Sequence, residues 1–556
     1  MKRKQRTALL LSLVLACTFA AAGLAEVKTT PAGELPILTA DSDKVTLTLG
    51  VVQYPFIADY ETNYFVRWVE EQTGVDLNFV MYPSDNANDK VLLTLSTGDT
   101  DNLPDVFLRV VMGTNNTIFG ASYAARWYDE GMIIPLNGLI DEYGFNYKST
   151  AETAAQYGYE IRKWSTSPDG SIYFLPSFSA SLTNTFPEKM WINQSWLDNL
   201  GLSMPATTEE FREVLRAFKE KDPNQNGLAD EIPLSGAKQA LYYAYDYLIN
   251  AFIYNDTYNS RMYVEDGTVK FAPTTGQWRE AMKYLRSLND EGLFYSGTFT
   301  QDTTTLTQIA LNENNVLGCF EGLGHDLVLT TSDQDVLDRW TYMPALTGPD
   351  GAHFVSYAAP GVSPGAVITT KCEYPEIAMR VLDAMMSYEG SLITRYGEKG
   401  VNWDDATPGS IGYYGTPAFL KIMQNTWAQA GQNQNFLQLS PYILDPAIAT
   451  GIEWGGDVKE AGYIKAMAVK NLQTTGVIPT ETLSNLVFTS DETEVVQSNR
   501  TDIDSYILQS IANFVAGDWD PSNDAQWEKY KAEFDHMGLA DYLNAVQTCY
   551  TRMNAQ

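Results

Sequence analysis

Residues 45–82 read VTLTLGVVQYPFIADYETNYFVRWVEEQTGVDLNFVMY, and this stretch decides the fold. Apolar residues alternate with polar or small ones from 45 to 51, which predicts a β-strand. The segments that follow carry helical and extended patterns in turn. These predicted elements are the helix at 65–73, the strand at 75–82, the helix at 86–96 and the strand at 105–110. Because strands separated by helices at this spacing form parallel sheets, the sequence predicts an α/β fold.

The chain is long enough for more than one hydrophobic core. It has 556 residues, of which 44% are hydrophobic and 19% charged, and this composition suits two globular lobes rather than a disordered chain. The formal net charge of -32 disfavours nucleic acids and anionic membranes as partners. Three cysteines beyond the N-terminal region, Cys319, Cys372 and Cys549, do not make a disulfide framework, and at most one pair is expected.

The N-terminus has the pattern of a targeting segment. Four basic residues precede an apolar run and a small-residue cleavage site, which predicts a signal peptide over residues 1–25. A second interpretation takes Cys17 as a lipidated cysteine, which would hold the protein at the outer face of the cell membrane instead of releasing it. Residues 26–43 are polar, contain proline and show no periodicity, so they are expected to form a tether.

A loop at residues 221–233, KDPNQNGLADEIP, has the opening pattern of an EF-hand calcium loop. Oxygen-bearing side chains alternate and a glycine follows where the loop must reverse. Proline replaces the usual closing glutamate at position twelve, so the neighbouring Glu231 would complete the shell. The predicted ligands of a structural calcium ion are Asp222, Asn224, Asn226, the Leu228 carbonyl, Asp230 and Glu231. The alternative is an Asn-Gly turn whose carboxylates face water.

The residues before this loop, WINQSWLDNLGLSMPATTEEFREVLRAF at 191–218, predict a helix that Thr208 caps and Glu209 begins. Together with the loop they resemble the family 1 extracellular solute-binding proteins of ABC importers, in particular the large oligosaccharide-binding branch that includes the alginate-binding proteins. The segment RYGEKGVNW at 395–403 is a further specific match, and similar blocks extend over most of 44–553. In that family the loop binds calcium, which agrees with the ligands named above.

The resemblance implies a two-lobed periplasmic-binding-protein fold of type II, with the lobes joined by a hinge that the chain crosses several times. Lobe one would comprise 44–178 plus 363–430, and lobe two 179–362 plus 431–556. The implied function is capture of an oligosaccharide between the lobes by hinge closure, followed by delivery to the permease subunits of an ABC transporter. A monomer is expected. A secreted carbohydrate-active enzyme and a binding module that feeds a sensor are the alternatives.

One motif favours an enzyme, but its chemistry is unsuitable. Residues 361–365, GVSPG, match the G-x-S-x-G nucleophile elbow. The elbow needs a backbone N–H after the serine for its oxyanion hole, and Pro364 has none. The histidines are isolated from cysteines and from one another, which favours neither a triad nor a zinc site. No catalytic residues are therefore predicted, although paired carboxylates remain possible in so acidic a chain.

Aromatic residues favour a carbohydrate ligand. The chain has 12 Trp and 33 Tyr, and the C–H faces of sugar rings pack on such side chains while their hydroxyls bind polar groups. The best candidates stand after strands or at expected hinge crossings. They are Tyr54 after the first strand, Arg109 at the end of the third, Trp191 near the first crossing, Glu321 after a short strand and Trp403 at the end of the 395–403 segment.

Overall fold

The computed structural model describes residues 26–109, 118–426, 431–444 and 446–555. The predicted signal peptide and Cys17 therefore lie outside the described residues. Within these ranges, no helix has both the length and the apolar character needed to cross a membrane.

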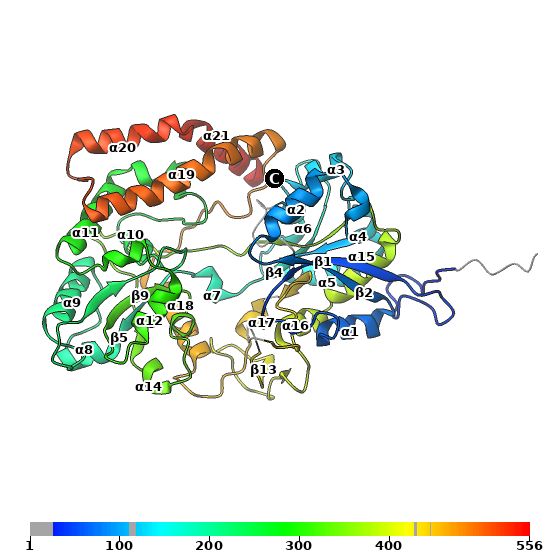
Figure 1. The fold of residues 1–556 in the computed structure, drawn as a ribbon, viewed down its shortest axis with the longest axis horizontal. Helices are drawn as coiled ribbons and strands as arrows, with labels where there is room; N and C mark the ends of the chain where they lie inside the picture. Colours follow the sequence, from blue (N-terminus) through cyan, green and yellow to red (C-terminus); the bar gives the residue numbers. More distant parts are fainter. Residues whose placement is uncertain (1–25, 110–117, 427–430, 445, 556) are drawn as a thin grey trace, which may run out of the picture.

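The chain folds into two lobes that lie side by side, each with its own sheet and core (Figure 1). The first lobe contains two stretches of the chain. Its elements are β1 (Thr46–Gln53), α1 (Tyr64–Thr73), β2 (Asp76–Pro83), α2 (Ala87–Ser96), η1 (Thr100–Asn102), β3 (Val106–Leu108), α3 (Ala124–Asp129), α4 (Asn137–Tyr143), α5 (Phe145–Ala155), α6 (Ile161–Ser165) and β4 (Leu175–Ser179), followed by β11 (Ser363–Ile368), α15 (Pro375–Met385), α16 (Tyr388–Tyr396), β12 (Trp403–Asp405), β13 (Leu420–Ile422), β14 (Tyr442–Leu444) and α17 (Pro446–Thr450).

The first sheet has the strand order β14-β4-β11-β3-β1-β2. Strands β1, β2 and β3 are parallel, with Thr46 opposite Asp76 and Leu49 opposite Val106. Strand β11 runs antiparallel to both of its neighbours, β3 and β4. The alternation of strands and helices predicted from residues 45–110 is therefore present, within one or two residues at most element ends.

Strand β14 lies at the edge of the first sheet, parallel to β4. Its neighbours Phe436 and Leu439, like Tyr442, belong to the first core. The sequence had assigned everything after residue 430 to the second lobe. The difference arises because β14 is only three residues long and lacks a pattern that would identify its sheet.

Residues 26–43, expected to be a tether, pack on the first lobe. Ile37 is fully buried, and its backbone N–H donates to the carbonyl of Thr73 at 2.7 Å. Arg380 of α15 donates to the carbonyls of Thr30, Pro31 and Glu34 at 2.8–3.0 Å. Two buried apolar residues, Ile37 and Leu38, and one guanidinium thus hold a segment that has no periodicity of its own.

The second lobe also contains two stretches of the chain. Its sheet has the order β10-β5-β9-β6, with β6 and β9 parallel and the other pairs antiparallel. Its elements are β5 (Lys189–Asn193), α8 (Gln194–Leu200), α9 (Thr208–Glu220), β6 (Ile232–Ser235), α10 (Tyr245–Ile249), β7 (Met262–Glu265), β8 (Thr268–Phe271), η2 (Ala272–Thr274), α11 (Gly276–Asp290), η3 (Ser296–Phe299), α12 (Thr303–Ala310), β9 (Leu317–Gly322), α13 (His325–Val328), α14 (Gln334–Leu337) and β10 (Trp340–Tyr342), followed by α18 (Ala461–Thr475), α19 (Ser490–Ala516), α20 (Asp524–His536) and α21 (Leu539–Asn554).

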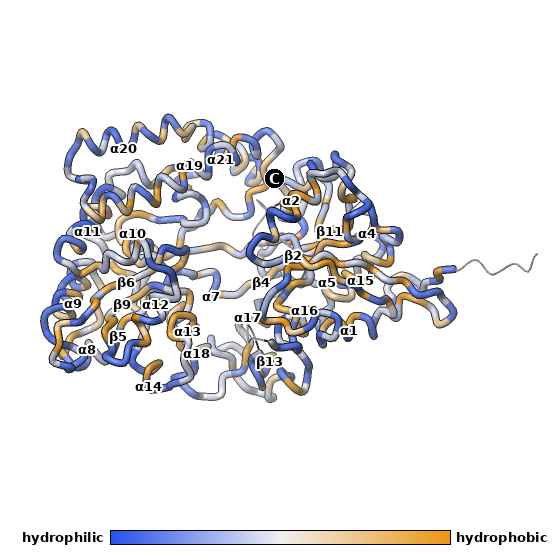
Figure 2. Tube along the Cα trace, in the orientation of Figure 1, coloured by the Kyte–Doolittle hydropathy of each residue, from blue (hydrophilic) through white to orange (hydrophobic). Residues whose placement is uncertain are grey.

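The chain passes between the sheets after β4, after β10 and after α17. The first crossing contains the short helix α7 (Leu182–Thr185) and is fastened by Lys189, whose ammonium group donates to the carbonyls of Thr183 and Leu323, both at 3.1 Å. In each lobe, hydrophobic residues are concentrated in the central strands, whereas hydrophilic residues are concentrated in outer helices such as α20 (Figure 2). Each lobe is thus a separate folded body, and a fixed crossing links the two.

Candidate functional site

A hollow of about 440 Å³ lies where β1 and β2 end in the first lobe. Its lining includes Gln53, Tyr54, Ser84 and Asp85. Strands β1 and β2 run from the outer end of the first lobe towards the second lobe (Figure 1). Because ligands of open α/β sheets bind beyond the carboxyl ends of parallel strands, this hollow is the expected place for one.

Tyr54 and Arg109, both predicted as ligand contacts, come close together here. Burial raises the pKa of the Tyr54 hydroxyl, and the positive charge of Arg109 opposes that shift. Arg109 donates to the carbonyl of Gln438 at 2.9 Å, and its guanidinium lies 5.7 Å from the ring centre of Tyr442. Its Nε is buried and has no partner among the described residues. The first-lobe hollow thus has the aromatic ring of Tyr54 in its lining, and the fixed cation of Arg109, which does not line the hollow, acts on that ring's hydroxyl.

A second hollow, of about 270 Å³, lies in the second lobe between α10, the loop 256–261 and α19. The residues that line it come from three distant parts of the sequence. Those with polar or aromatic side chains are Tyr243, Asp246, Thr257, Tyr258, Ser260, Arg261 and Asp504. We call this cavity the second-lobe hollow.

A buried ion pair forms one wall of the second-lobe hollow. Arg261 lies 3.0 Å from one Asp246 oxygen and donates to the other at 3.2 Å, and the two side chains are 6% and 2% exposed. Arg261 also donates to the side chain of Asn255 at 3.2 Å. Ser260 and Arg261 have φ of 52° and 61°, a conformation that costs energy for non-glycine residues and persists where the surroundings fix it. The wall is therefore rigid and its two charges are paired.

Trp191, Glu321 and Trp403, also predicted as ligand contacts, lie in the core in this structure and line neither hollow. The indole N–H groups of Trp191 and Trp403 donate to the carbonyls of Gly322 at 3.0 Å and Gly397 at 2.8 Å. Burial raises the pKa of the Glu321 carboxyl well above its usual value. The sequence placed these residues after strands or at crossings, but it does not show that neighbouring elements cover them.

The sequence analysis missed the residues of the second-lobe hollow. A signal was available in LYYAYDYL at 241–248 and NDTYNSR at 255–261, where tyrosines and polar residues alternate without a strand or helix pattern. The sequence does not show that these segments line one hollow together with Asp504, which lies in the middle of α19.

The predicted calcium loop is compact and polar. Asp222 accepts backbone N–H groups of Asn226 at 3.0 Å and Gly227 at 3.1 Å, while Asp230 accepts the Asn226 side-chain amide at 3.0 Å. One oxygen of Glu231 is buried without a partner in the described part of the chain, and burial raises the pKa of that carboxyl. No group of three or more His, Cys, Asp or Glu side chains that could hold a metal is gathered in the described residues. The residues still fit a cation, because amide and carbonyl oxygens supply half of the predicted ligands.

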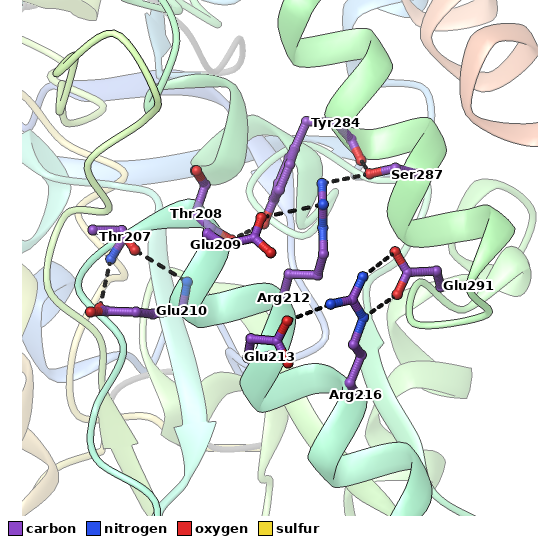
Figure 3. A network of polar contacts seen from close by, with 10 residues as sticks. All are labelled: Thr207, Thr208, Glu209, Glu210, Arg212, Glu213, Arg216, Tyr284, Ser287 and Glu291. Atoms are coloured by element: carbon purple, nitrogen blue, oxygen red, sulfur yellow. Dashed lines mark hydrogen bonds and ion pairs between the residues drawn. The ribbon is translucent and has the colours of Figure 1, made fainter.

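Helix α9, which leads into this loop, is firmly anchored. Thr207 caps it, with Glu210 completing a capping box, so the helix begins one residue earlier than predicted and Thr208 is not the cap. Figure 3 shows Arg216 of α9 between Glu213 and Glu291, with a contact to Glu291 at 2.9 Å that fastens α9 to the end of α11. The loop therefore starts from a fixed point.

Comparison with known proteins agrees with this architecture. The family model of bacterial extracellular solute-binding proteins matches residues 52–391. The fructooligosaccharide ABC transporter substrate-binding protein FusA of Streptococcus pneumoniae is 27% identical over 566 residues, which cover 100% of this chain and 99% of FusA. A structure of FusA in complex with kestose superimposes with a TM-score of 0.75 at 26% identity, over 92% of this chain and 99% of that one.

Two further solved structures are relevant to the loop at 221–233. An EF-hand mutant of S. pneumoniae FusA in complex with fructo-nystose is similar with a TM-score of 0.74 at 25% identity, over 92% of this chain and 99% of that one. The alginate-binding protein AlgQ2, solved without calcium ion, has the same fold, with a TM-score of 0.65 at 22% identity over 92% and 99% of the two chains. The two-lobed fold and the family predicted from the sequence are confirmed, and the chain belongs to the bacterial extracellular solute-binding protein family.

Proposed function

We propose that the chain is the extracytoplasmic solute-binding component of an ABC transporter, which captures an oligosaccharide between its lobes and delivers it to a membrane permease. The observation that carries this proposal is that each lobe has a hollow with tyrosine and carboxylate side chains in its lining. The full-length similarity to a fructooligosaccharide-binding protein supports the ligand class. The protein acts as a monomer, either secreted or anchored through Cys17.

Ligand capture follows from the two-lobed architecture. In the first lobe, Tyr54 offers a ring on which a sugar can pack and Arg109 offers N–H donors to its hydroxyls. Closure about the crossings, the first of which Lys189 fastens, would bring the lobes together around the ligand. Contact between the ligand and Trp191, Glu321 or Trp403 would require these buried side chains to become exposed as the lobes move.

The calcium loop has a structural role in this proposal. Asp222, Asn224, Asn226, the Leu228 carbonyl, Asp230 and Glu231 would hold the ion, with the two amides turned so that their oxygens face it. The partnerless Glu231 oxygen supports this arrangement, because a buried carboxylate oxygen needs a proton or a cation. The ion would neutralise several carboxylates and fix the connection between α9 and β6.

The test is the melting temperature of the mature protein in calcium buffer against kestose, nystose, maltotetraose and trigalacturonate. A ligand present at a hundred times its dissociation constant raises the stability by about 2.7 kcal/mol. We expect an upward shift with one class of sugar, and chromatography afterwards should recover that sugar intact. Cleaved sugar would instead identify a carbohydrate-active enzyme. A pull-down then separates the two binding functions. Capture of permease subunits would identify an importer component, and capture of a sensor would identify a binding module that feeds that sensor.

A further inference from the structure

The second-lobe hollow presents two tyrosine rings in different surroundings. Tyr243 stacks on Tyr245, with ring centres 5.0 Å apart and planes 15° apart, and Tyr245 stacks in turn on Phe299. Tyr258, on the opposite loop, is 44% exposed although it borders a cavity. One ring is therefore fixed by the core, while the other has a free surface on which the C–H face of a sugar can pack.

The two walls of this hollow are tied together by Arg500 of α19. Its guanidinium donates to the carbonyl of Tyr258 at 2.9 Å and to the carboxylate of Asp504 at 3.3 Å. Nearer the start of α19, the hydroxyl of Thr493 donates to the carbonyl of Ser122 in the first lobe at 3.4 Å. The hollow is thus preformed and stands next to a contact between the lobes, where ligand binding and lobe movement can be coupled.

The charges of the lining favour a neutral occupant. Arg261 is the cation among the lining residues, and Asp246 already neutralises it at 3.0 Å. Asp504 adds a further carboxylate, which Arg500 pairs at 3.3 Å and which still accepts hydrogen bonds from hydroxyl groups, so the lining offers no unpaired cation to a uronate. The hydroxyls of Thr257 and Ser260 complete a polar surface without adding charge.

From these observations we propose that the second-lobe hollow, through Tyr258 and Asp504, binds one uncharged sugar unit of the oligosaccharide and selects against uronic acids. This inference rests on the proposed function and names the ligand class for it. At about 270 Å³ the hollow is smaller than the about 300–1,000 Å³ typical of whole ligand sites, which suits one ring of a longer chain. The first-lobe hollow would then contact the remaining units.

The experiment is isothermal titration calorimetry of the mature protein with nystose and maltotetraose as neutral probes and trigalacturonate as the charged one. Loss of the Tyr258 ring in Tyr258→Ala, or of the carboxylate in Asp504→Asn, should weaken binding of the neutral sugar about tenfold. Tyr258→Phe keeps the ring face and should bind nearly as wild type. Tyr295→Ala is the matched control, because Tyr295 is 38% exposed in the same lobe and lines neither hollow.

The outcomes separate the two proposals. If a neutral sugar binds and both Tyr258→Ala and Asp504→Asn leave its affinity unchanged, the second-lobe subsite is wrong while the transport function stands. Binding of trigalacturonate as tightly as the neutral probes would overturn the charge argument alone. If no probe binds the wild-type protein, the proposed function fails together with this inference. Circular dichroism of each variant checks that it is folded.

Discussion

The two hollows are built in different ways. The first lies at the ends of regular parallel strands, so Tyr54 and Asp85 reach it because of their positions after β1 and β2. The second has no strand end in its lining and is formed by a loop, a short helix and the middle of α19. Regular structure thus places the first hollow, whereas the second depends on one buried ion pair and on strained backbone.

The lobes also differ in how they hold a buried carboxylate. In the first lobe, Asp383 accepts backbone N–H groups from Asn146 at 3.0 Å and Tyr147 at 2.9 Å, all uncharged donors at the start of α5. In the second lobe, Asp246 is held by the guanidinium of Arg261. An ion pair is more sensitive to loss of one partner, because the remaining charge stays buried without compensation.

The largest expected effect is therefore from Arg261→Met in the second lobe. Loss of the guanidinium leaves Asp246 unpaired and should lower the unfolding free energy by about 3–5 kcal/mol, whereas Asp383→Asn in the first lobe should cost about 1–3 kcal/mol. Urea unfolding followed by circular dichroism measures both. The double variant Asp246→Leu/Arg261→Met should recover most of the loss, and equal instability of single and double variants would contradict the ion-pair argument.

Acid should destabilise the second lobe through His325, a buried histidine at the start of α13. Burial lowers the pKa of His325 to about 4 from its usual 6.5, and its neighbours Asp326 and Lys465 act in opposite directions. Between these pH values His325 is protonated in the unfolded chain but neutral in the folded chain. The unfolding free energy therefore falls as the pH drops from 6.5 towards 4. The loss from this one group is about 3 kcal/mol at most.

The variant His325→Phe isolates this effect. It keeps a ring against Trp191, whose centre lies 4.8 Å from that of His325, and removes the titration. The unfolding free energy of the variant should therefore decline less than that of wild type between pH 6.5 and pH 4. Parallel pH curves for the two proteins would show that His325 does not titrate as argued. His536→Phe is the control, since His536 is exposed.

Calcium removal should affect the second lobe alone. At a calcium concentration a hundred times the dissociation constant, chelation should lower the unfolding free energy of the wild-type protein by about 2.7 kcal/mol. The variant Asp222→Ala should show the same loss and should not respond further to the chelator. Hydrogen exchange should rise at α9 and β6 and stay unchanged at β1 and β2. A uniform rise in both lobes, or no response of the wild-type protein, would rule out a structural ion in this loop.

Sequence reasoning succeeded where local pattern determines structure. The alternation from residue 45 to 51 predicted β1, and Tyr54, which follows that strand, lines the first-lobe hollow, while its contact with a ligand stays a prediction. It failed for β14 and for the tether, because a three-residue strand and a segment held by Arg380 have no periodic signal. The second-lobe hollow was missed for a related reason, since Tyr258 and Asp504 meet only through long-range packing.

The smallest expected effect concerns helix caps, which both lobes use. Thr207 caps α9 in the second lobe by accepting the N–H of Glu210 at 3.1 Å on an exposed surface. Asn63 caps α1 in the first lobe, is fully buried and also donates to the carbonyl of Asn435 at 3.0 Å. Thr207→Ala should cost about 1 kcal/mol and Thr207→Ser almost nothing, whereas Asn63→Ala should cost more because it removes a second, buried hydrogen bond together with the cap. Urea unfolding decides the order, and a larger loss for Thr207→Ala would mean that the start of α9, rather than the buried cap of α1, controls stability.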